Sequence, residues 1–324
     1  AYELLQKNQY DGVVLDVNMP KMNGIQFLRA LQKDKIRARI MMASTDTKDG
    51  AKVTMEALDL GAIDFIEKPV NIVYLKSSGF KDKFLETLQA VVTSRQTNIS
   101  AVSAVTAVSR EKQDETTQKL VNIVRKSQPA VVGQKIVALA CSTGGPKALQ
   151  SVVPRLPAEL AAPVLIVQHM PKGFTQSLAE RLDSMSRIRV KEAAEGDVLE
   201  NGVVYISMGG KHMNVATKGG RATITYTDEP PREGVKPCAN YMYESLKTSS
   251  FAQIVCVVLT GMGADGTRGI VNLETSKKIH VIAQDEASST VYGMPKAIAA
   301  TGLVNQVVSL DNVAQEIIMS VGVR

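Results

Sequence analysis

A chain of 324 residues with 44% hydrophobic content is long enough for two domains, each with its own core. No stretch reaches the roughly 18 uninterrupted apolar residues of a membrane span, and the N-terminus lacks the basic-then-apolar pattern of a signal peptide. The sequence therefore predicts a cytoplasmic protein without membrane insertion. Three cysteines (Cys141, Cys238 and Cys256) without CxxC spacing indicate neither a disulfide framework nor a cysteine zinc site.

The net charge of +6 is concentrated in the middle of the chain. Residues 71–134 carry 9 basic and 5 acidic side chains, whereas residues 1–70 carry 10 of each. Nucleic-acid-binding proteins usually concentrate positive charge on a folded module and stack bases on aromatic side chains. A basic middle segment, no tryptophan and 4% aromatic residues therefore argue against nucleic acid as a partner.

Residues 1–94 are expected to form a first α/β domain, because short apolar runs alternate with helical patterns. The expected strands of its parallel sheet are 12–15, 40–43 and 62–66. The expected helices are one at the N-terminus and those at 24–33, at 52–60 with Gly61 as C-cap, and at 81–95. A sheet covered on both faces normally has more than three strands, so this domain is expected to lack its first strands.

Residues 95–134 are expected to be a linker with a helical stretch at 115–126, because they are rich in Ser, Thr, Ala and Val with mixed charges. Residues 135–324 are expected to form a larger, mostly parallel, doubly wound α/β domain. Its expected strands are 136–140, 164–167, 203–206, 222–226, 254–259 and 279–283, with an antiparallel excursion around 203–226. Its expected helices are 147–156, 175–185, 239–247, 294–300 and 312–321.

Three side chains of complementary chemistry follow strands of the second domain. Ser142 comes after the first of these strands, His169 after the second, and Asp265 after the strand at 254–259. Loops that follow parallel strands share one edge of the sheet, so we expect these side chains to converge. A hydroxyl, an imidazole and a carboxylate in mutual reach are the nucleophile, base and orienting acid of a hydrolytic triad. The residues around Ser142, Ala-Cys-Ser-Thr-Gly, also resemble a relaxed Gly-x-Ser-x-Gly elbow.

Each of these residues also has a plain structural interpretation. Ser142 suits a helix cap or an anion-binding loop, His169 a surface imidazole, and Asp265 a Gly-Ala-Asp-Gly turn. His212, in a turn-like Gly-Gly-Lys-His sequence, is a rival for the base, and Cys141 is a rival nucleophile. His169 is preferred because it directly follows a strand of the same type as the strand before Ser142.

In the first domain the same rule brings Asp16, Ser44 and Lys68 to one edge of the sheet. A carboxylate, a hydroxyl and an ammonium group there suit a phosphoryl acceptor, whose product is hydrogen-bonded by Ser44 and paired with Lys68. Each of the three also fits an ordinary solvated loop residue.

Two sets of motifs resemble known families. The first set resembles a response-regulator receiver domain and consists of Leu15-Asp16-Val-Asn-Met-Pro20, Ser44 and Gly61-Ala-Ile-Asp-Phe-Ile-Glu-Lys68-Pro69. The second set resembles the catalytic domain of the chemotaxis protein-glutamate methylesterase. It consists of Cys-Ser142-Thr-Gly-Gly-Pro, Gln-His169-Met-Pro, Gly-Met-Gly-Ala-Asp265-Gly, Gln284-Asp-Glu-Ala-Ser and Gly293-Met-Pro. The order receiver, linker, esterase is that family's layout, and the receiver implies a flavodoxin-like fold.

This resemblance implies hydrolysis of glutamate methyl esters on chemoreceptors and, in many members, deamidation of receptor glutamines. It implies Ser142 as nucleophile, His169 as general base and Asp265 as its partner, with Thr143 and Met262 shaping the oxyanion site. The hydrolytic step needs no cofactor. In this family the unphosphorylated receiver blocks the esterase, and phosphorylation of the acceptor, here Asp16, by the chemotaxis histidine kinase relieves the block.

Two departures from the family pattern bear on these expectations. The paired acidic residues that hold Mg²⁺ beside the acceptor belong to a strand that this sequence does not contain, so no metal site is complete in it and Mg²⁺ is expected only for a full-length chain. The stretch Lys236-Pro-Cys-Ala-Asn240 stands where Arg-Pro-Ser-Val-Asp is more usual, which affects expected substrate contacts. An alternative function is a non-catalytic, receiver-controlled adaptor for chemoreceptors. A DNA-binding output is disfavoured, because no short helix-turn-helix unit closes the chain.

Overall fold

The computed structural model describes residues 1–45, 47–69, 78–94, 118, 121, 124 and 134–324. The chain divides into two compact units, residues 1–109 and 110–324. The linker expected at 95–134, with the helix expected inside it, lies outside the described residues except for 118, 121, 124 and 134.

The first unit contains a three-stranded parallel sheet in the order β1-β2-β3. Its strands are β1 (Val13–Asp16), β2 (Ile40–Ser44) and β3 (Asp64–Glu67), and its helices are α1 (Tyr2–Lys7), α2 (Gly24–Lys33), α3 (Lys48–Asp59) and α5 (Ser78–Thr93). Helix α2 begins at a capping box, in which Asn23 and Gln26 each accept from the other's backbone N–H. Gly61 follows the end of α3 with φ +101°, which confirms its predicted role as a stop.

The second unit is built on a seven-stranded sheet in the order β12-β11-β10-β4-β5-β7-β6, and every pairing in it is parallel. The strands are β4 (Lys135–Cys141), β5 (Val164–Gln168), β6 (Arg189–Glu192), β7 (Val203–Ile206), β10 (Gln253–Val258), β11 (Lys278–Gln284) and β12 (Gln306–Val308). Strands β8 (His212–Lys218) and β9 (Arg221–Thr227) form a separate antiparallel hairpin. The order reverses between β4 and β10, which makes this boundary a topological switch point.

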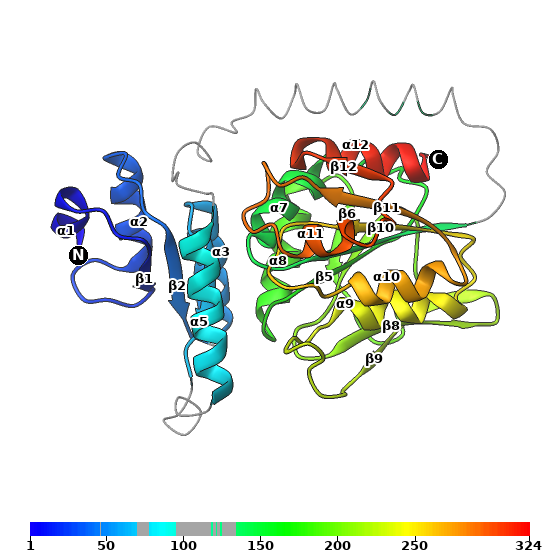
Figure 1. The fold of residues 1–324 in the computed structure, drawn as a ribbon, viewed down its shortest axis with the longest axis horizontal. Coiled ribbons are helices and arrows are strands. Elements are labelled where there is room, and N and C mark those ends of the chain that lie inside the picture. Colours follow the sequence, from blue (N-terminus) through cyan, green and yellow to red (C-terminus); the bar gives the residue numbers. More distant parts are fainter. Residues whose placement is uncertain (46, 70–77, 95–117, 119–120, 122–123, 125–133) are drawn as a thin grey trace. The chain divides into compact units, whose positions relative to one another are not determined.

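Helices cover both faces of the large sheet, as the prediction of a doubly wound fold requires (Figure 1). Helices α7 (Gly145–Val152), α8 (Phe174–Met185) and α12 (Leu310–Val321) lie on one face. Helices α9 (Ala239–Ser245), α10 (Thr267–Glu274) and α11 (Met294–Ala299) lie on the other with the β8–β9 hairpin, and share a core with alternate residues of β4, β5, β10 and β11. Short 3₁₀ turns, η2 (Val153–Arg155) and η3 (Leu246–Thr248), extend α7 and α9.

The structure corrects the prediction at five places in the second unit. Strands β6, β8 and β12 are absent from the expected elements, and so is helix α10, which begins directly after Gly266. The predicted antiparallel pairing around 203–226 is only partly right, because β7 joins the parallel sheet and β9 instead pairs with β8. Of the unexpected strands, β6 and β12 have at most four residues and lie at the two edges of the large sheet, where burial imposes the weakest hydrophobic pattern.

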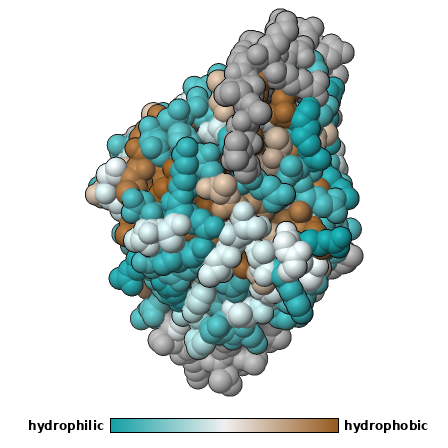
Figure 2. All heavy atoms as spheres, turned by 90° about the vertical axis from the view of Figure 1, so that its right-hand side faces the viewer, coloured by the Kyte–Doolittle hydropathy of each residue, from teal (hydrophilic) through white to brown (hydrophobic). Residues whose placement is uncertain are grey.

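The face of the molecule seen in Figure 2 is a mixture of hydrophilic and hydrophobic residues, with the hydrophobic ones in scattered groups. Exposed large apolar residues occur on several separate elements, among them Val271 on α10, Val307 on β12 and Met319 on α12. Single exposed apolar side chains are normal on protein surfaces. Among the described residues no helix is both long and apolar enough to cross a membrane.

Candidate active site

Ser142 and His169 occupy equivalent positions, each one residue beyond the end of a strand in the middle of the sheet. Strand β4 ends at Cys141 and β5 ends at Gln168, and these two end residues are register partners. The His169 N–H donates to Cys141 O (3.2 Å), and the Ser142 N–H donates to Thr260 O (3.0 Å), just beyond β10. The backbone of both predicted catalytic residues is therefore fixed by neighbouring strands.

The chain turns directly from β4 into α7, so that Ser142 lies beside a helix N-terminus. All but the first residue of β4 are buried, which places the strand in the centre of the unit. Gly144 is the N-cap of α7, no side chain caps the helix, and Pro146 lies in its first turn. The free N–H groups and the dipole of a helix N-terminus favour negative charge. This location suits a group that becomes negative during acyl transfer.

His169 and Asp265 are joined as predicted. His169 Nε2 lies 2.7 Å from Asp265 Oδ2, and only 6% and 4% of the two side chains is exposed. Burial pushes the pKa of the Asp265 carboxyl up, but hydrogen bonds from His169, Cys238 and a backbone N–H outweigh it and lower the pKa to about 2. An ionised Asp265 accepts from Nε2–H, which leaves the lone pair of the neutral imidazole on Nδ1.

The Ser142 hydroxyl is not engaged in this arrangement. The residue is 9% exposed, and its Oγ makes no hydrogen bond to any group in the described part of the chain. A general base has to come within hydrogen-bond reach of the hydroxyl during reaction, and such contacts are often absent before substrate binds. The structure thus shows the imidazole–carboxylate pair formed, and Ser142 directly follows Cys141, whose carbonyl accepts from the His169 N–H.

Thr143 and Met262, the residues predicted to shape an oxyanion site, lie in the loops after β4 and β10. Thr143 is 7% exposed and its carbonyl accepts from Thr260 Oγ1 (3.0 Å). Met262 is half-buried and follows Gly261, where an added Cβ would come within 2.8 Å of Ser142 Cβ. The two loops are in contact, and within the described segments neither the Thr143 nor the Met262 N–H donates a hydrogen bond.

The two rival residues are occupied elsewhere. His212 begins β8 instead of lying in the expected turn, and it is fully buried. Its Nδ1 accepts from the Cys238 N–H (3.2 Å), and its Nε2 lies 3.2 Å from Pro230 O. Burial lowers the pKa of His212 and raises that of the Cys141 thiol, so both groups are held neutral. Cys141 Sγ donates to Gln168 Oε1 (3.0 Å).

The unusual stretch at 236–240 holds Asp265, a role that the sequence did not reveal. Cys238 Sγ donates to Asp265 Oδ1 (3.0 Å), and the backbone N–H groups of Ala239 and Asn240 donate to the same carboxylate (2.6 and 3.0 Å). Asn240 Oδ1 accepts from the Gly269 N–H (2.6 Å) and so ties α9 to α10. Cys238 thus supplies a donor to the carboxylate, and Asn240 supplies an acceptor to α10.

In the first unit Asp16 and Lys68 form an ion pair at the ends of β1 and β3. Lys68 Nζ lies 2.6 Å from Asp16 Oδ1, and both side chains are about one-third exposed. Burial raises the pKa of Asp16, but hydrogen bonds from Lys68 and the Asn18 N–H outweigh it and lower the pKa overall. Ser44 is buried, and its hydroxyl donates to Gly50 O (3.2 Å) in α3.

The described residues of the first unit do not fit a Mg²⁺ site. Mg²⁺ in proteins takes six oxygen ligands, usually from one or two carboxylates with waters and phosphates. Asp16 is already paired with Lys68, and the described residues contain no group of three or more His, Cys, Asp or Glu placed to hold a metal.

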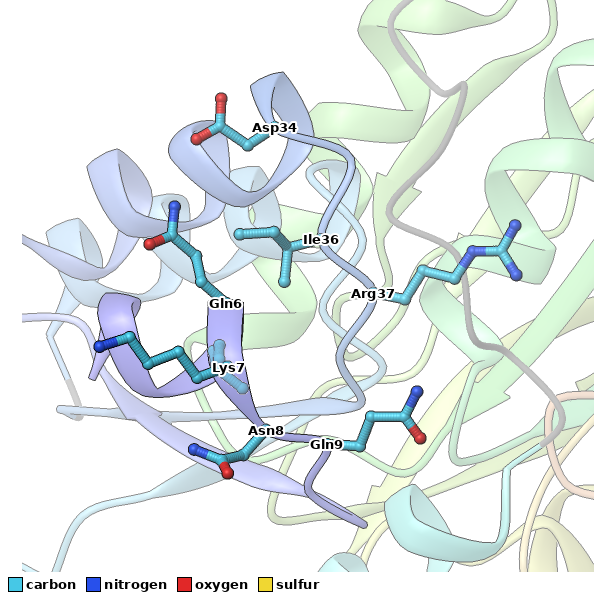
Figure 3. A pocket seen from close by; sticks show the side chains of 8 residues that line it. Gln6, Lys7, Asn8, Gln9, Asp34, Ile36 and Arg37 are labelled. Carbon is cyan, nitrogen blue, oxygen red and sulfur yellow. The ribbon is translucent and has the colours of Figure 1, made fainter.

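A pocket of about 820 Å³ lies between the end of α1 and the segment after α2 in the first unit. Its lining is polar apart from two aliphatic residues, and its long side chains point in different directions (Figure 3). None of the predicted site residues lines it, and no set of groups converges there as in a ligand site.

Comparison with known proteins agrees with this geometry. Residues 137–317 match the CheB methylesterase family, and residues 1–78 match the response regulator receiver domain. The chain belongs to the CheB methylesterase family. The predicted order of a receiver followed by a methylesterase domain is confirmed.

Relatives of the whole chain carry the same two activities in their names. A protein-glutamate methylesterase/protein-glutamine glutaminase of Pyrococcus abyssi is 40% identical over 99% of this chain and 83% of its own length. The namesake of Geobacillus kaustophilus is 38% identical over 99% of this chain and 88% of its own length. The crystal structure of the Thermotoga maritima CheB methylesterase catalytic domain superposes with a TM-score of 0.57 at 36% identity, covering 59% of this chain and all of that domain.

Proposed function

We propose that this chain is a phosphorylation-regulated chemotaxis protein-glutamate methylesterase that hydrolyses glutamate methyl esters on chemoreceptors. The observation that carries the proposal is the buried His169–Asp265 pair, at the carboxyl ends of the parallel strands, where Ser142 follows β4. Family membership and the names of full-length relatives support this reaction class.

The proposed reaction is acyl transfer in two steps. Ser142 Oγ attacks the ester carbonyl and gives its proton to His169 Nδ1, because Nε2 is held by Asp265. The imidazolium then protonates the departing methoxide, and methanol leaves a glutamyl ester on Ser142. Water attacks this ester with His169 again as base, which releases the glutamate carboxylate and restores the serine. The ionised Asp265 stabilises the imidazolium in both steps.

The oxyanion of each tetrahedral intermediate needs donors near Ser142. The N–H groups of Thr143 and Met262 and the first turn of α7 are proposed to supply them, because the loops that carry them meet at Ser142.

The experiment that tests the proposal compares Ser142→Ala with Ser151→Ala. Both changes remove a hydroxyl, but Ser151 lies inside α7 and its Oγ donates only to Lys147 O (3.4 Å). Methanol release from methylated receptor fragments should be lost in Ser142→Ala and retained in Ser151→Ala. Release at the original rate by Ser142→Ala would eliminate the assignment.

The adaptor alternative predicts a different outcome in a second assay. An adaptor has no activated serine, so a fluorophosphonate probe would leave the folded protein unlabelled while receptor fragments still bound. Glutaminase activity, also in the names of the relatives, is tested in parallel by ammonia release from a receptor fragment with glutamine at the substrate position.

Regulation is proposed to act through Asp16 as phosphoryl acceptor, with the chemotaxis histidine kinase as donor and the cytoplasm as location. Support comes from the receiver match and from the Asp16–Lys68 pair, which places a cation where the added negative charge would appear. Phosphoryl transfer from the kinase to the full-length protein, lost in Asp16→Asn, is the expected result.

A further inference from the structure

The amide of Gln168 hydrogen-bonds the backbone carbonyls of both residues that have to exchange a proton. Gln168 is the last residue of β5, and its side chain is only 2% exposed. Its Nε2 donates to Ser142 O (3.0 Å) and to His169 O (3.2 Å), and its Oε1 accepts from Cys141 Sγ (3.0 Å). Both amide protons and the amide oxygen therefore have partners.

The backbone around Gln168 is built to admit this amide. An added Cβ at Gly145 would come within 1.9 Å of Gln168 Oε1 and 2.9 Å of its Cδ, so the glycine lets the amide lie against the first turn of α7. The Gly145 N–H donates to Ser142 O (2.7 Å), the same carbonyl that accepts from Gln168. The carbonyl of Ser142 is thus held from the helix side and from the β5 side at once.

We infer that Gln168 is a positioning residue that sets the separation of Ser142 and His169. This inference rests on the proposed function, because it assigns a purpose to the distance between nucleophile and base. The argument is that each catalytic residue follows the end of a different strand, and Gln168 is the side chain seen to hydrogen-bond the backbone of both. The two N–H donors of Gln168 belong to one rigid planar amide. Movement of Ser142 relative to His169 would therefore break a buried hydrogen bond.

The first test replaces the amide with an apolar side chain of similar length in the full chain. Gln168→Met leaves the His169 carbonyl without this donor and removes one of two from the Ser142 carbonyl. We expect kcat to fall about 10- to 100-fold, since a misplacement of about 1 Å has an effect of this size, while KM stays within about threefold. The rate of fluorophosphonate labelling at Ser142 should fall in parallel, because it depends on the same separation.

Tyr205→Phe is the matched control. Tyr205 is 1% exposed, and its hydroxyl also serves two backbone groups, accepting from the Glu200 N–H (3.1 Å) and donating to Val198 O (2.9 Å). It contacts neither Ser142 nor His169 through these bonds. We expect a lower melting temperature in both variants but a lower kcat only in Gln168→Met.

Gln168→Glu separates positioning from general stability by its pH dependence. A protonated glutamic acid at this buried position still accepts from Cys141 and donates one hydrogen bond, whereas the carboxylate donates none. The kcat of Gln168→Glu should therefore decline with rising pH along a limb that is absent from the wild type and from Gln168→Met. If Gln168→Met does not fold, the pH profile of Gln168→Glu still tests the positioning role.

Three results would overturn the inference. They are a Gln168→Met enzyme with kcat and labelling rate within about threefold of the wild type, an equal kcat loss in Tyr205→Phe, and a Gln168→Glu pH profile that superposes on the wild-type profile. Failure of the underlying function gives a different result, namely undiminished turnover in Ser142→Ala whatever residue stands at 168.

Discussion

Asp265 is the most heavily hydrogen-bonded carboxylate of the candidate site. Besides His169, its donors are the Cys238 thiol and the backbone N–H groups of Ala239, Asn240 and Gly266. A carboxylate held by this many donors stays ionised and keeps one orientation. It therefore fixes the imidazole tautomer that leaves Nδ1 free for its proposed role as base.

Asp265→Asn should lower kcat by about 10³- to 10⁴-fold, because an amide presents N–H to donors and no longer stabilises an imidazolium. KM should change much less, since the carboxylate is buried behind His169. Methanol release under saturating substrate measures the effect. A loss of less than about tenfold would show that Asp265 does not act through His169.

Asp265 should also make stability depend on pH. Its pKa is lowered on folding to about 2, so its contribution is fully present above the unfolded value and is lost as pH falls through the folded value. The drop from 3.8 to about 2 corresponds to about 2 kcal/mol. The difference in unfolding free energy between wild type and Asp265→Asn should shrink by about this amount between pH 6 and about pH 2. A difference that is constant with pH in urea titrations would contradict it.

At the scale of elements, the junction between β4 and α7 depends on the absence of a side chain at residue 145. Gly145→Ala would drive a methyl group into the Gln168 amide, and forced overpacking of this kind costs about 1–3 kcal/mol. Thermal unfolding should show the loss, together with slower labelling of Ser142. Gly79→Ala in α5 is the control, because a Cβ there meets nothing within 4 Å and should leave stability unchanged or slightly raised.

The sequence predicted long, strongly patterned elements well and short or polar ones poorly. Helix α2 has the bounds that the pattern of its apolar residues predicts, because these residues share one face. Strand β6 was missed because Arg189, Lys191 and Glu192 hide a four-residue edge strand whose existence depends on pairing with β7. Pairing between segments distant in the sequence is not written in local periodicity.

The same distinction applies to the candidate site. Ser142, His169 and Asp265 were predicted because chain order and the strand-end rule locate them without any side-chain detail. The contacts of Gln168 and Cys238 were missed, although both residues stood in recognised motifs, because they depend on where a buried side chain turns. Direction of that kind follows from packing, which one sequence does not display.

At the scale of the whole molecule, each unit has its own buried core. The first is built from residues such as Leu28 and Met41, and the second from residues such as Ile166 and Ile317. Units with separate cores are able to unfold separately.

Leu28→Ala should destabilise the first unit by about 2–5 kcal/mol and leave the labelling rate of Ser142 unchanged. Ile317 in α12 is equally buried. Ile317→Ala should leave the first unit unaffected, destabilise the second unit and change the labelling rate of Ser142. Calorimetry with a parallel labelling assay distinguishes the two. A single transition shifted equally by both substitutions would show that the units unfold as one.

The reversal of strand order between β4 and β10 has a consequence for biosynthesis. When the ribosome has synthesised the chain only as far as β7, Ser142 and His169 are already present. Asp265 follows β10, which begins more than forty residues later. A product that ends before β10 therefore lacks the carboxylate of the proposed triad. In stalled nascent chains of increasing length, fluorophosphonate labelling of Ser142 should appear when β10 joins the sheet.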